Sequence, residues 1–227
     1  MRQSIRAFVG LAESVFRSQE PVVEFGSYQV NGQDSVGDLR PLFSPKKYTG
    51  CDMRPGNGVD RVENVESCTF KDGEAGSVVF VDTIEHVRRP EAAVKEIARI
   101  LRPGGLLFMA SVMDFPIHNH PHDYWRFTPE GFKSLLSVFP ESIIGFQGHA
   151  LQPHTVFGIG FKTASPKNAD LFRAFQSRAG EIGKAAQFKP YKKKLASLFS
   201  RSDSYFGQVA AKYASFDDVS FEFVRNA

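Results

Sequence analysis

The chain has 227 residues, of which 42% are hydrophobic and 23% charged, so it can build one substantial core but is short for two. Its 22 Phe, 6 Tyr and single Trp exclude a disordered, low-complexity or collagen-like protein. The formal net charge of +3 is too balanced for a protein that binds nucleic acid or a membrane surface by charge alone. Cys51 and Cys68 match neither a disulfide framework nor a CxxC metal pair, which favours buried thiols in a reducing compartment.

The first residues predict an amphipathic helix rather than a targeting segment. Apolar residues recur at intervals of three and four from Ile5 to Phe16, and Glu13 interrupts the run before it reaches the length of a signal peptide's apolar region. No stretch approaches the roughly 18 uncharged apolar residues of a membrane-spanning helix. We therefore expect residues 1–19 to be a helix packed on a soluble, cytoplasmic domain with no membrane partner.

Strands and helices alternate in the next part of the chain. The run at residues 77–81 is almost entirely apolar, as expected for a strand covered on both faces, and Pro103-Gly104-Gly105 is expected to end the helix that follows it. The predicted elements are, in chain order, a strand at 22–25, a helix around 36–43, strands at 48–51, 59–62 and 77–81, a helix from Pro90 to Leu101, a strand at 106–110, a helix that opens at Thr128-Pro129, and strands at 143–146 and 156–161.

This order predicts an α/β fold, because consecutive parallel strands need a helical crossover. We expect residues 20–162 to form a Rossmann-like, doubly wound, mostly parallel seven-stranded sheet, with the last two strands as an antiparallel edge hairpin. Residues 163–227 are expected to be a basic, mostly helical extension. Within them, residues 184–201 hold six Lys and Arg and no Asp or Glu.

In such a sheet the ligand site lies beyond the carboxyl ends of the strands. Gly26 follows the first strand and lets backbone approach a ligand closely. Asp52 ends the second strand, where it can accept two hydrogen bonds from a ribose diol. The pair suits a cofactor that contains adenosine, although a turn glycine and a solvated aspartate would give the same pattern.

Four parts of the sequence resemble the class I S-adenosylmethionine-dependent methyltransferases, in the subgroup called type 11. They are Val22 to Val30 (VVEFGSYQV), Asp52, Val81 to Val87 (VDTIEHV) and residues 91–112 (EAAVKEIARILRPGGLLFMASV). The resemblance covers roughly residues 20–162 and implies S-adenosyl-L-methionine as the cofactor. The cofactor-binding residues that it implies are Glu24, Gly26 and Ser27 in the first motif, Asp52 at the ribose, Asn64 and Val65 beside the adenine, and Asp82 near the methionine moiety.

The first motif departs from the pattern of the family. The usual E-x-G-x-G-x-G is represented by Glu24-Phe25-Gly26-Ser27-Tyr28-Gln29-Val30, which keeps one glycine of three. The loop must therefore be built differently. A sulfonium cofactor has no pyrophosphate and needs a less close approach of the backbone, so the departure also argues against NAD.

The segment from Phe115 to Thr128 is dense in polar and aromatic residues and follows the fifth strand. It is similar to a His-x-x-Pro-x-Asp-Tyr-x-Arg-Phe-Thr stretch in a subset of these enzymes, and the match selects as catalytic candidates His118, Asp123, Tyr124 and Arg126, together with Pro121. Histidine titrates near neutral pH, so we expect His118 to take the proton of the methyl acceptor.

Other interpretations of these residues stay open. Asp123 and Arg126 could pair as a structural clamp, Tyr124 and Trp125 could be core aromatics, and His86 could hold a loop in place. The three histidines at 118, 120 and 122 could suggest a metal, but without a neighbouring carboxylate or cysteine we expect none.

The sequence thus predicts a cytoplasmic methyltransferase that acts on an oxygen or nitrogen atom of a small molecule. The resemblance suggests a sugar or glycan as one acceptor class. Two alternatives remain: a nicotinamide-dependent oxidoreductase on a similar sheet, and a non-catalytic adenosyl-ligand-binding or interaction protein that uses its basic tail on RNA or an acidic partner. The oligomeric state does not follow from the sequence.

Overall fold

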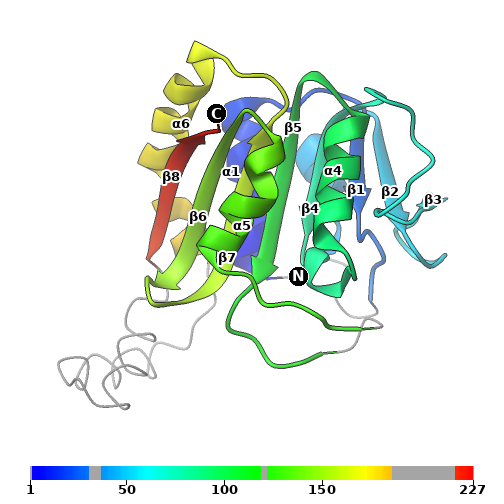
Figure 1. Ribbon diagram of the computed structural model, residues 1–227, viewed down its shortest axis with the longest axis horizontal. Coiled ribbons are helices and arrows are strands. Elements are labelled where there is room, and N and C mark those ends of the chain that lie inside the picture. The colour runs from blue at the N-terminus through cyan, green and yellow to red at the C-terminus, as the bar shows by residue number, and fades with distance from the viewer. Residues whose placement is uncertain (1, 31–36, 119–121, 186–217, 227) are drawn as a thin grey trace.

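A twisted sheet forms the middle layer of the molecule, and helices cover both of its faces (Figure 1). The computed structural model describes residues 2–30, 37–118, 122–185 and 218–226. In these residues the sheet has eight strands in the order β3-β2-β1-β4-β5-β7-β6-β8. The strands are β1 (Val22–Phe25), β2 (Tyr48–Asp52), β3 (Arg61–Val62), β4 (Ala75–Val81), β5 (Leu101–Val112), β6 (Glu141–His149), β7 (Gln152–Phe161) and β8 (Val219–Arg225).

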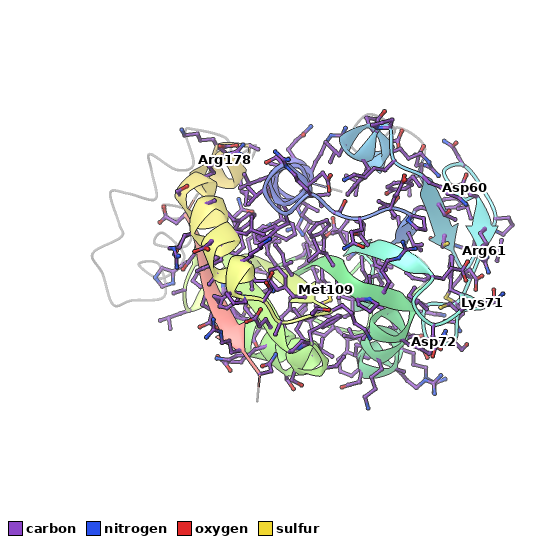
Figure 2. All side chains as sticks on the ribbon, turned by 90° about the horizontal axis from the view of Figure 1, so that it is seen from above. Asp60, Arg61, Lys71, Asp72, Met109 and Arg178 are labelled. Atoms are coloured by element: carbon purple, nitrogen blue, oxygen red, sulfur yellow. The ribbon has the colours of Figure 1, made fainter. Side chains whose placement is uncertain are left out.

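The helices lie on opposite sides of the sheet, as the view from above in Figure 2 shows. One side carries α4 (Pro90–Ile100), α5 (Pro129–Leu135) and the 3₁₀ turns η1 (Ile84–His86) and η2 (Leu136–Val138). The other side carries α1 (Gln3–Phe16), α3 (Arg40–Phe43), α6 (Pro166–Arg178) and α7 (Gly180–Lys184). None of the helices in the described part of the chain is long and apolar enough to cross a membrane.

The N-terminal helix α1 packs against the sheet through aromatic side chains, as its periodicity predicts. Phe8 stacks on Phe157 of β7 at 4.7 Å between ring centroids and meets the edge of Phe175 from α6 at 6.2 Å. All three rings are buried. Helix α1 therefore belongs to the core of the domain, and this fixes the position of Arg2 at its start.

The boundary between α4 and β5 differs from the prediction. The helix ends at Ile100, and β5 begins at Leu101, so that Pro103-Gly104-Gly105 lies inside the strand. The register between β4 and β5 shifts here, and Gly104 has a φ of +78°. The two glycines therefore form a β-bulge rather than a helix stop.

The C-terminal region adds a strand as well as helices. β8 pairs antiparallel with β6, and Phe221 of β8 packs beneath Phe8 and Phe157. The predicted hairpin of β6 and β7 is therefore interior, with β8 at the edge. Of the six basic residues at 184–201, all except Lys184 lie outside the described residues.

The strand order reverses between β1 and β4. From β1 the chain continues to β2 and β3 on one side, and β4, β5 and the antiparallel strands lie on the other. Residues after β1 and β4 can turn to opposite faces at this point and leave a crevice at the carboxyl ends of the strands.

Candidate functional site

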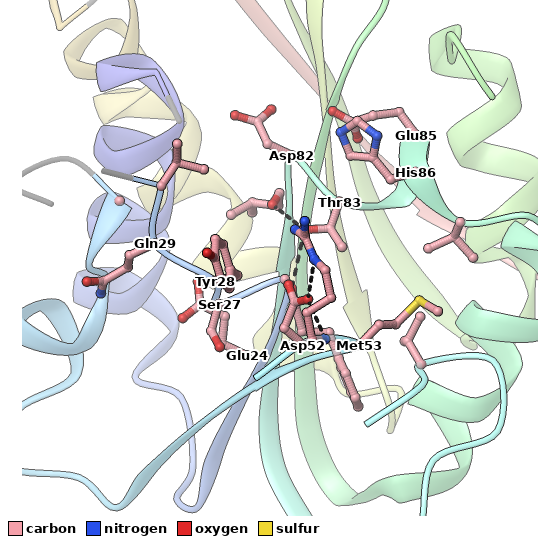
Figure 3. A pocket seen from close by; sticks show the side chains of 18 of the residues that line it. Glu24, Ser27, Tyr28, Gln29, Asp52, Met53, Asp82, Thr83, Glu85 and His86 are labelled. Carbon is pink, nitrogen blue, oxygen red and sulfur yellow. Dashed lines mark hydrogen bonds and ion pairs between the residues drawn. The ribbon is translucent and has the colours of Figure 1, made fainter. Parts of the chain in front are cut away.

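A cleft of about 360 Å³ opens at this reversal point. Its walls come from the carboxyl ends of β1, β2, β4 and β5 and from the segments that follow them. Figure 3 shows Glu85 and His86 beside one another, away from Glu24 and Asp52. The cleft therefore has two ends with different side chains. Its volume lies within the range of small-molecule sites, roughly 300–1,000 Å³.

Gly26 forms the sharp turn after β1. Its φ is +87°, and a Cβ placed on it would lie 1.9 Å from Oγ1 of Thr83. Its N–H and that of Ser27 both donate to the carbonyl of Cys51, at 2.8 and 3.0 Å. The glycine is thus required for the close packing of the first loop against β2 and Thr83.

The two missing glycines of the first loop have counterparts in the loop after β2. A Cβ on Gly56 would lie 2.3 Å from the Tyr28 ring, and one on Gly58 would lie 2.4 Å from the carbonyl of Ser27 and 2.9 Å from Gln29. The larger side chains of the first loop therefore pack over glycines on its neighbour. This arrangement explains how the loop accommodates Tyr28 and Gln29.

Asp52 lies at the end of β2 and lines the cleft, as predicted. Its Oδ1 accepts a hydrogen bond from the backbone N–H of Arg54 at 3.0 Å, and the Arg54 guanidinium lies 4.7 Å from the centre of the Tyr28 ring. Val65 also lines the cleft and is buried.

Asn64, which the resemblance implies beside the adenine, is not among the residues that line the cleft. It is exposed, and its side-chain oxygen accepts the N–H of Glu66, which holds the side chain in the local turn. The preceding residue, Glu63, lines the cleft instead, and its carboxylate accepts hydrogen bonds from the N–H and hydroxyl of Thr69.

Glu24 lines the cleft from β1 and is buried. Burial raises its pKa to about 7, and the hydroxyl of Tyr48, which donates to its Oε2 at 2.7 Å, opposes that shift. A cation that binds nearby would stabilise the ionised form of this carboxyl group.

Asp82 follows β4 and has a φ of +45°, which is uncommon for a residue other than glycine. It pairs with Arg2 at 2.9 Å. Arg2 also donates to Nδ1 of His154 at 2.8 Å, and burial lowers the pKa of this histidine to about 4. The start of α1 thus closes one wall of the cleft, which no local pattern at Arg2 indicates.

The other end of the cleft holds Glu85, His86 and His118. The Ser111 hydroxyl donates to Oε2 of Glu85 at 2.8 Å, and burial raises the pKa of Glu85, to which the neighbouring Asp82 adds. Nδ1 of His86 donates to the carbonyl of His122 at 2.5 Å. His86 therefore holds the 115–126 segment in place and also lines the cleft.

Of the four predicted catalytic residues, His118 alone is among the residues that line the cleft. Asp123 has a side chain only 2% exposed and pairs with both terminal nitrogens of Arg126, at 2.6 and 2.7 Å. The hydrogen bonds from Arg126 hold the pKa of Asp123 well below its usual range. The ion pair that the clamp interpretation expects is therefore present, and it lies next to His118.

Tyr124 and Trp125 are not core residues, whereas Phe127 is. Tyr124 is 46% and Trp125 41% exposed, and the Trp125 indole N–H donates to the carbonyl of Val87 at 2.9 Å. Tyr124 is tied to Glu85 through its backbone N–H rather than its hydroxyl. Both rings lie on the surface, and neither residue is among those that line the cleft.

The lining of the cleft is rich in carboxyl groups, and it stays negative when Glu24 and Glu85, whose pKa values burial raises, are protonated. Its lining has five carboxyl groups and two guanidinium groups: Glu24, Asp52, Glu63, Asp82 and Glu85, with Arg2 and Arg54. Such a lining attracts a cation and repels a pyrophosphate, which disfavours a nicotinamide dinucleotide.

Comparison with known proteins gives a matching family model and similar folds. A family model described as a methyltransferase domain, type 11, matches residues 40–109. A search of the curated proteins found no match.

Among solved structures, Burkholderia thailandensis 1,6-didemethyltoxoflavin-N1-methyltransferase, with 1,6-didemethyltoxoflavin and S-adenosylhomocysteine bound, superimposes with a TM-score of 0.53. The sequences are 12% identical, over 71% of this chain and 79% of that one. A chain from the complex between the Haloferax volcanii Trm112 methyltransferase activator and a putative methyltransferase gives a TM-score of 0.51 and 16% identity, over 72% of this chain and 91% of that one. These similarities show the fold. The family match at residues 40–109 adds that this part of the chain is similar to a methyltransferase domain.

Proposed function

We propose that the protein is an S-adenosylmethionine-dependent methyltransferase that acts on an oxygen or nitrogen atom of a small molecule, and that His118 activates this atom. The proposal rests on the placement of His118, which lines the cleft while hydrogen-bond acceptors contact Nδ1 of its ring. Its Nδ1 faces Oδ2 of Asp123 at 3.0 Å and the carbonyl of Pro116 at 3.2 Å. Both are acceptors, so Nδ1 carries the proton and Nε2 carries the lone pair. The lone pair can take a proton from a hydroxyl or amine as it is methylated.

The cofactor belongs at the other end of the cleft. When bound, S-adenosylmethionine supplies a methyl group on a positively charged sulfur. In this proposal Asp52 accepts hydrogen bonds from the ribose hydroxyls, Val65 packs beside the adenine, and Glu24 and Asp82 face the positively charged part. The negative lining of the cleft fits this charge. Ser27 supports the fit as well, since its hydroxyl is buried and has no hydrogen-bond partner among the described residues.

The acceptor enters beside the 115–126 segment in this proposal. Phe115 lines the cleft and is 40% exposed, and Trp125 presents a partly exposed ring whose N–H is already bonded. Fixed aromatic faces at a cleft mouth pack against flat or ring-shaped ligands. A sugar or glycan hydroxyl is therefore the acceptor class to test first, and aromatic amines and phenols come next.

The test follows S-adenosylhomocysteine production with panels of sugar, phenol and amine acceptors. His118→Ala should lower turnover by roughly 10²- to 10⁴-fold, the usual contribution of proton transfer, with cofactor affinity unchanged. His122→Ala is the matched control, because its side chain is exposed on the same segment and does not line the cleft. A His118→Ala enzyme with wild-type turnover would refute the proposed role.

A further inference from the structure

Three metal-ligating side chains converge at the acceptor end of the cleft. Glu85 and His86 come from η1, and His118 follows β5. One candidate ligand atom from each residue lies within 4.8 Å of the other two. We propose that Glu85, His86 and His118 bind one divalent transition-metal cation, with Zn²⁺ as the type ion.

A hydrogen bond to a neighbouring group orients each of these three side chains, as is usual for metal ligands. Asp123 and the Pro116 carbonyl accept from Nδ1 of His118, and the His122 carbonyl accepts from Nδ1 of His86. These contacts assign the lone pair of both rings to Nε2. The Ser111 hydroxyl fixes the carboxylate of Glu85. Hydrogen bonds of this kind orient the ligands in known metal sites and set the tautomer of each histidine.

The donor atoms select the class of cation. Two imidazole nitrogens and one carboxylate oxygen suit Zn²⁺, Co²⁺ or Fe²⁺, whereas Mg²⁺ and Ca²⁺ prefer oxygen ligands alone. Metal–ligand bonds of about 2.0–2.2 Å would require the ligand atoms to approach by roughly 1 Å.

Three protein ligands leave coordination positions open toward the cleft, as in catalytic metal sites. This inference rests on the proposed function and deepens it. A cation at this position would lower the pKa of a bound acceptor hydroxyl, so that its proton passes to water before the methyl group arrives, and His118 would then serve as a ligand rather than as the base, because the ligand bond and the proton transfer use the same lone pair. The sequence predicts no metal because the carboxylate partner comes from η1, a separate part of the chain.

The test begins with protein freed of metal by a chelator and then dialysed. Calorimetric titration with ZnCl₂ should show one site, MgCl₂ should show none, and CoCl₂ should give the intense visible absorption of four- or five-coordinate Co²⁺. His118→Ala and Glu85→Gln should each weaken Zn²⁺ binding by more than about 100-fold. Asp123→Asn should weaken it by roughly 10- to 100-fold, the range for a residue that orients a ligand. His122→Ala should bind as the wild type does.

Zn²⁺ should also raise the melting temperature of the wild type but not of Glu85→Gln. Zn²⁺ affinity unchanged in both His118→Ala and Glu85→Gln would overturn the metal site, as would failure of the wild type to bind Zn²⁺ or Co²⁺. If the chelator-treated wild type methylates acceptors at its full rate while His118→Ala does not, the metal site fails and the proposed function stands. If Zn²⁺ binds as expected but His118→Ala has normal turnover, the proposed role of His118 fails.

Discussion

Replacing Glu24 by Gln should change how the stability of the protein depends on pH. Glu24 is buried in β1, where Tyr48 donates to it and Arg40, Asp38 and Asp60 contribute charge. Its pKa rises from 4.5 to about 7 on folding, because burial disfavours the ionised form. The folded protein therefore holds this proton more tightly than the unfolded chain does. The protonated carboxyl group of Glu24 contributes its full stabilisation below the pKa of 4.5 that it has in the unfolded chain. This stabilisation is lost as the pH rises from 4.5 to about 7.

The magnitude follows from the two pKa values. The difference corresponds to about 3 kcal/mol of unfolding free energy between pH 4.5 and pH 8.5 in the wild type. Glu24→Gln keeps an acceptor for the Tyr48 hydroxyl but cannot ionise. Relative to the wild type, its unfolding free energy should therefore increase by about 3 kcal/mol over that pH range.

Urea unfolding of both proteins at several pH values measures this difference directly. The slopes with denaturant should be the same for the two proteins, so that midpoints can be compared. If the wild type and Glu24→Gln show the same pH dependence, Glu24 is not a buried carboxyl with a raised pKa. The conclusion that burial raises the pKa of Glu24 in the cleft would then be wrong.

Three further substitutions test the cleft and its supports. Asp52→Ala should weaken S-adenosylhomocysteine binding by about 1.5–3 kcal/mol, with an unchanged melting temperature, and wild-type affinity would remove Asp52 from the site. Gly26→Ala should destabilise the protein by at least about 1 kcal/mol, because a Cβ there lies 1.9 Å from Thr83 at a φ of +87°; thermal unfolding at the wild-type temperature would contradict this geometry. Arg126→Met should cost about 3 kcal/mol, since it leaves the Asp123 carboxylate buried without its ion pair, and urea unfolding should detect the loss.

Local patterns are sufficient to predict most of the sheet. The all-apolar β4 and the periodic α4 are visible because each is long and its burial repeats regularly. The bulge at residues 103–105 is not, because Pro-Gly-Gly is typical of helix ends and the structure uses it within a strand. β8 is also missed, since its pairing with β6 depends on a partner far away in the sequence.

Local patterns likewise predict some residues of the candidate site and miss others. Gly26 and Asp52 can be predicted because each directly follows a recognisable strand. The grouping of Arg2 with Asp82, and of Glu85 with His118, cannot, because it arises where α1, β4 and β5 meet. Tyr124 and Arg126 are selected by the resemblance, but the structure directs one to the surface and the other to the clamp on Asp123.

Every role proposed for the cleft depends on the binding of S-adenosylmethionine there. Calorimetric titration of the full chain with S-adenosylmethionine, S-adenosylhomocysteine and NADH tests it most directly. We expect one site for each of the two adenosyl compounds, no binding of NADH, and weaker binding of both compounds by Asp52→Ala. Tight binding of NADH, or no binding of either adenosyl compound by the folded wild type, would contradict it.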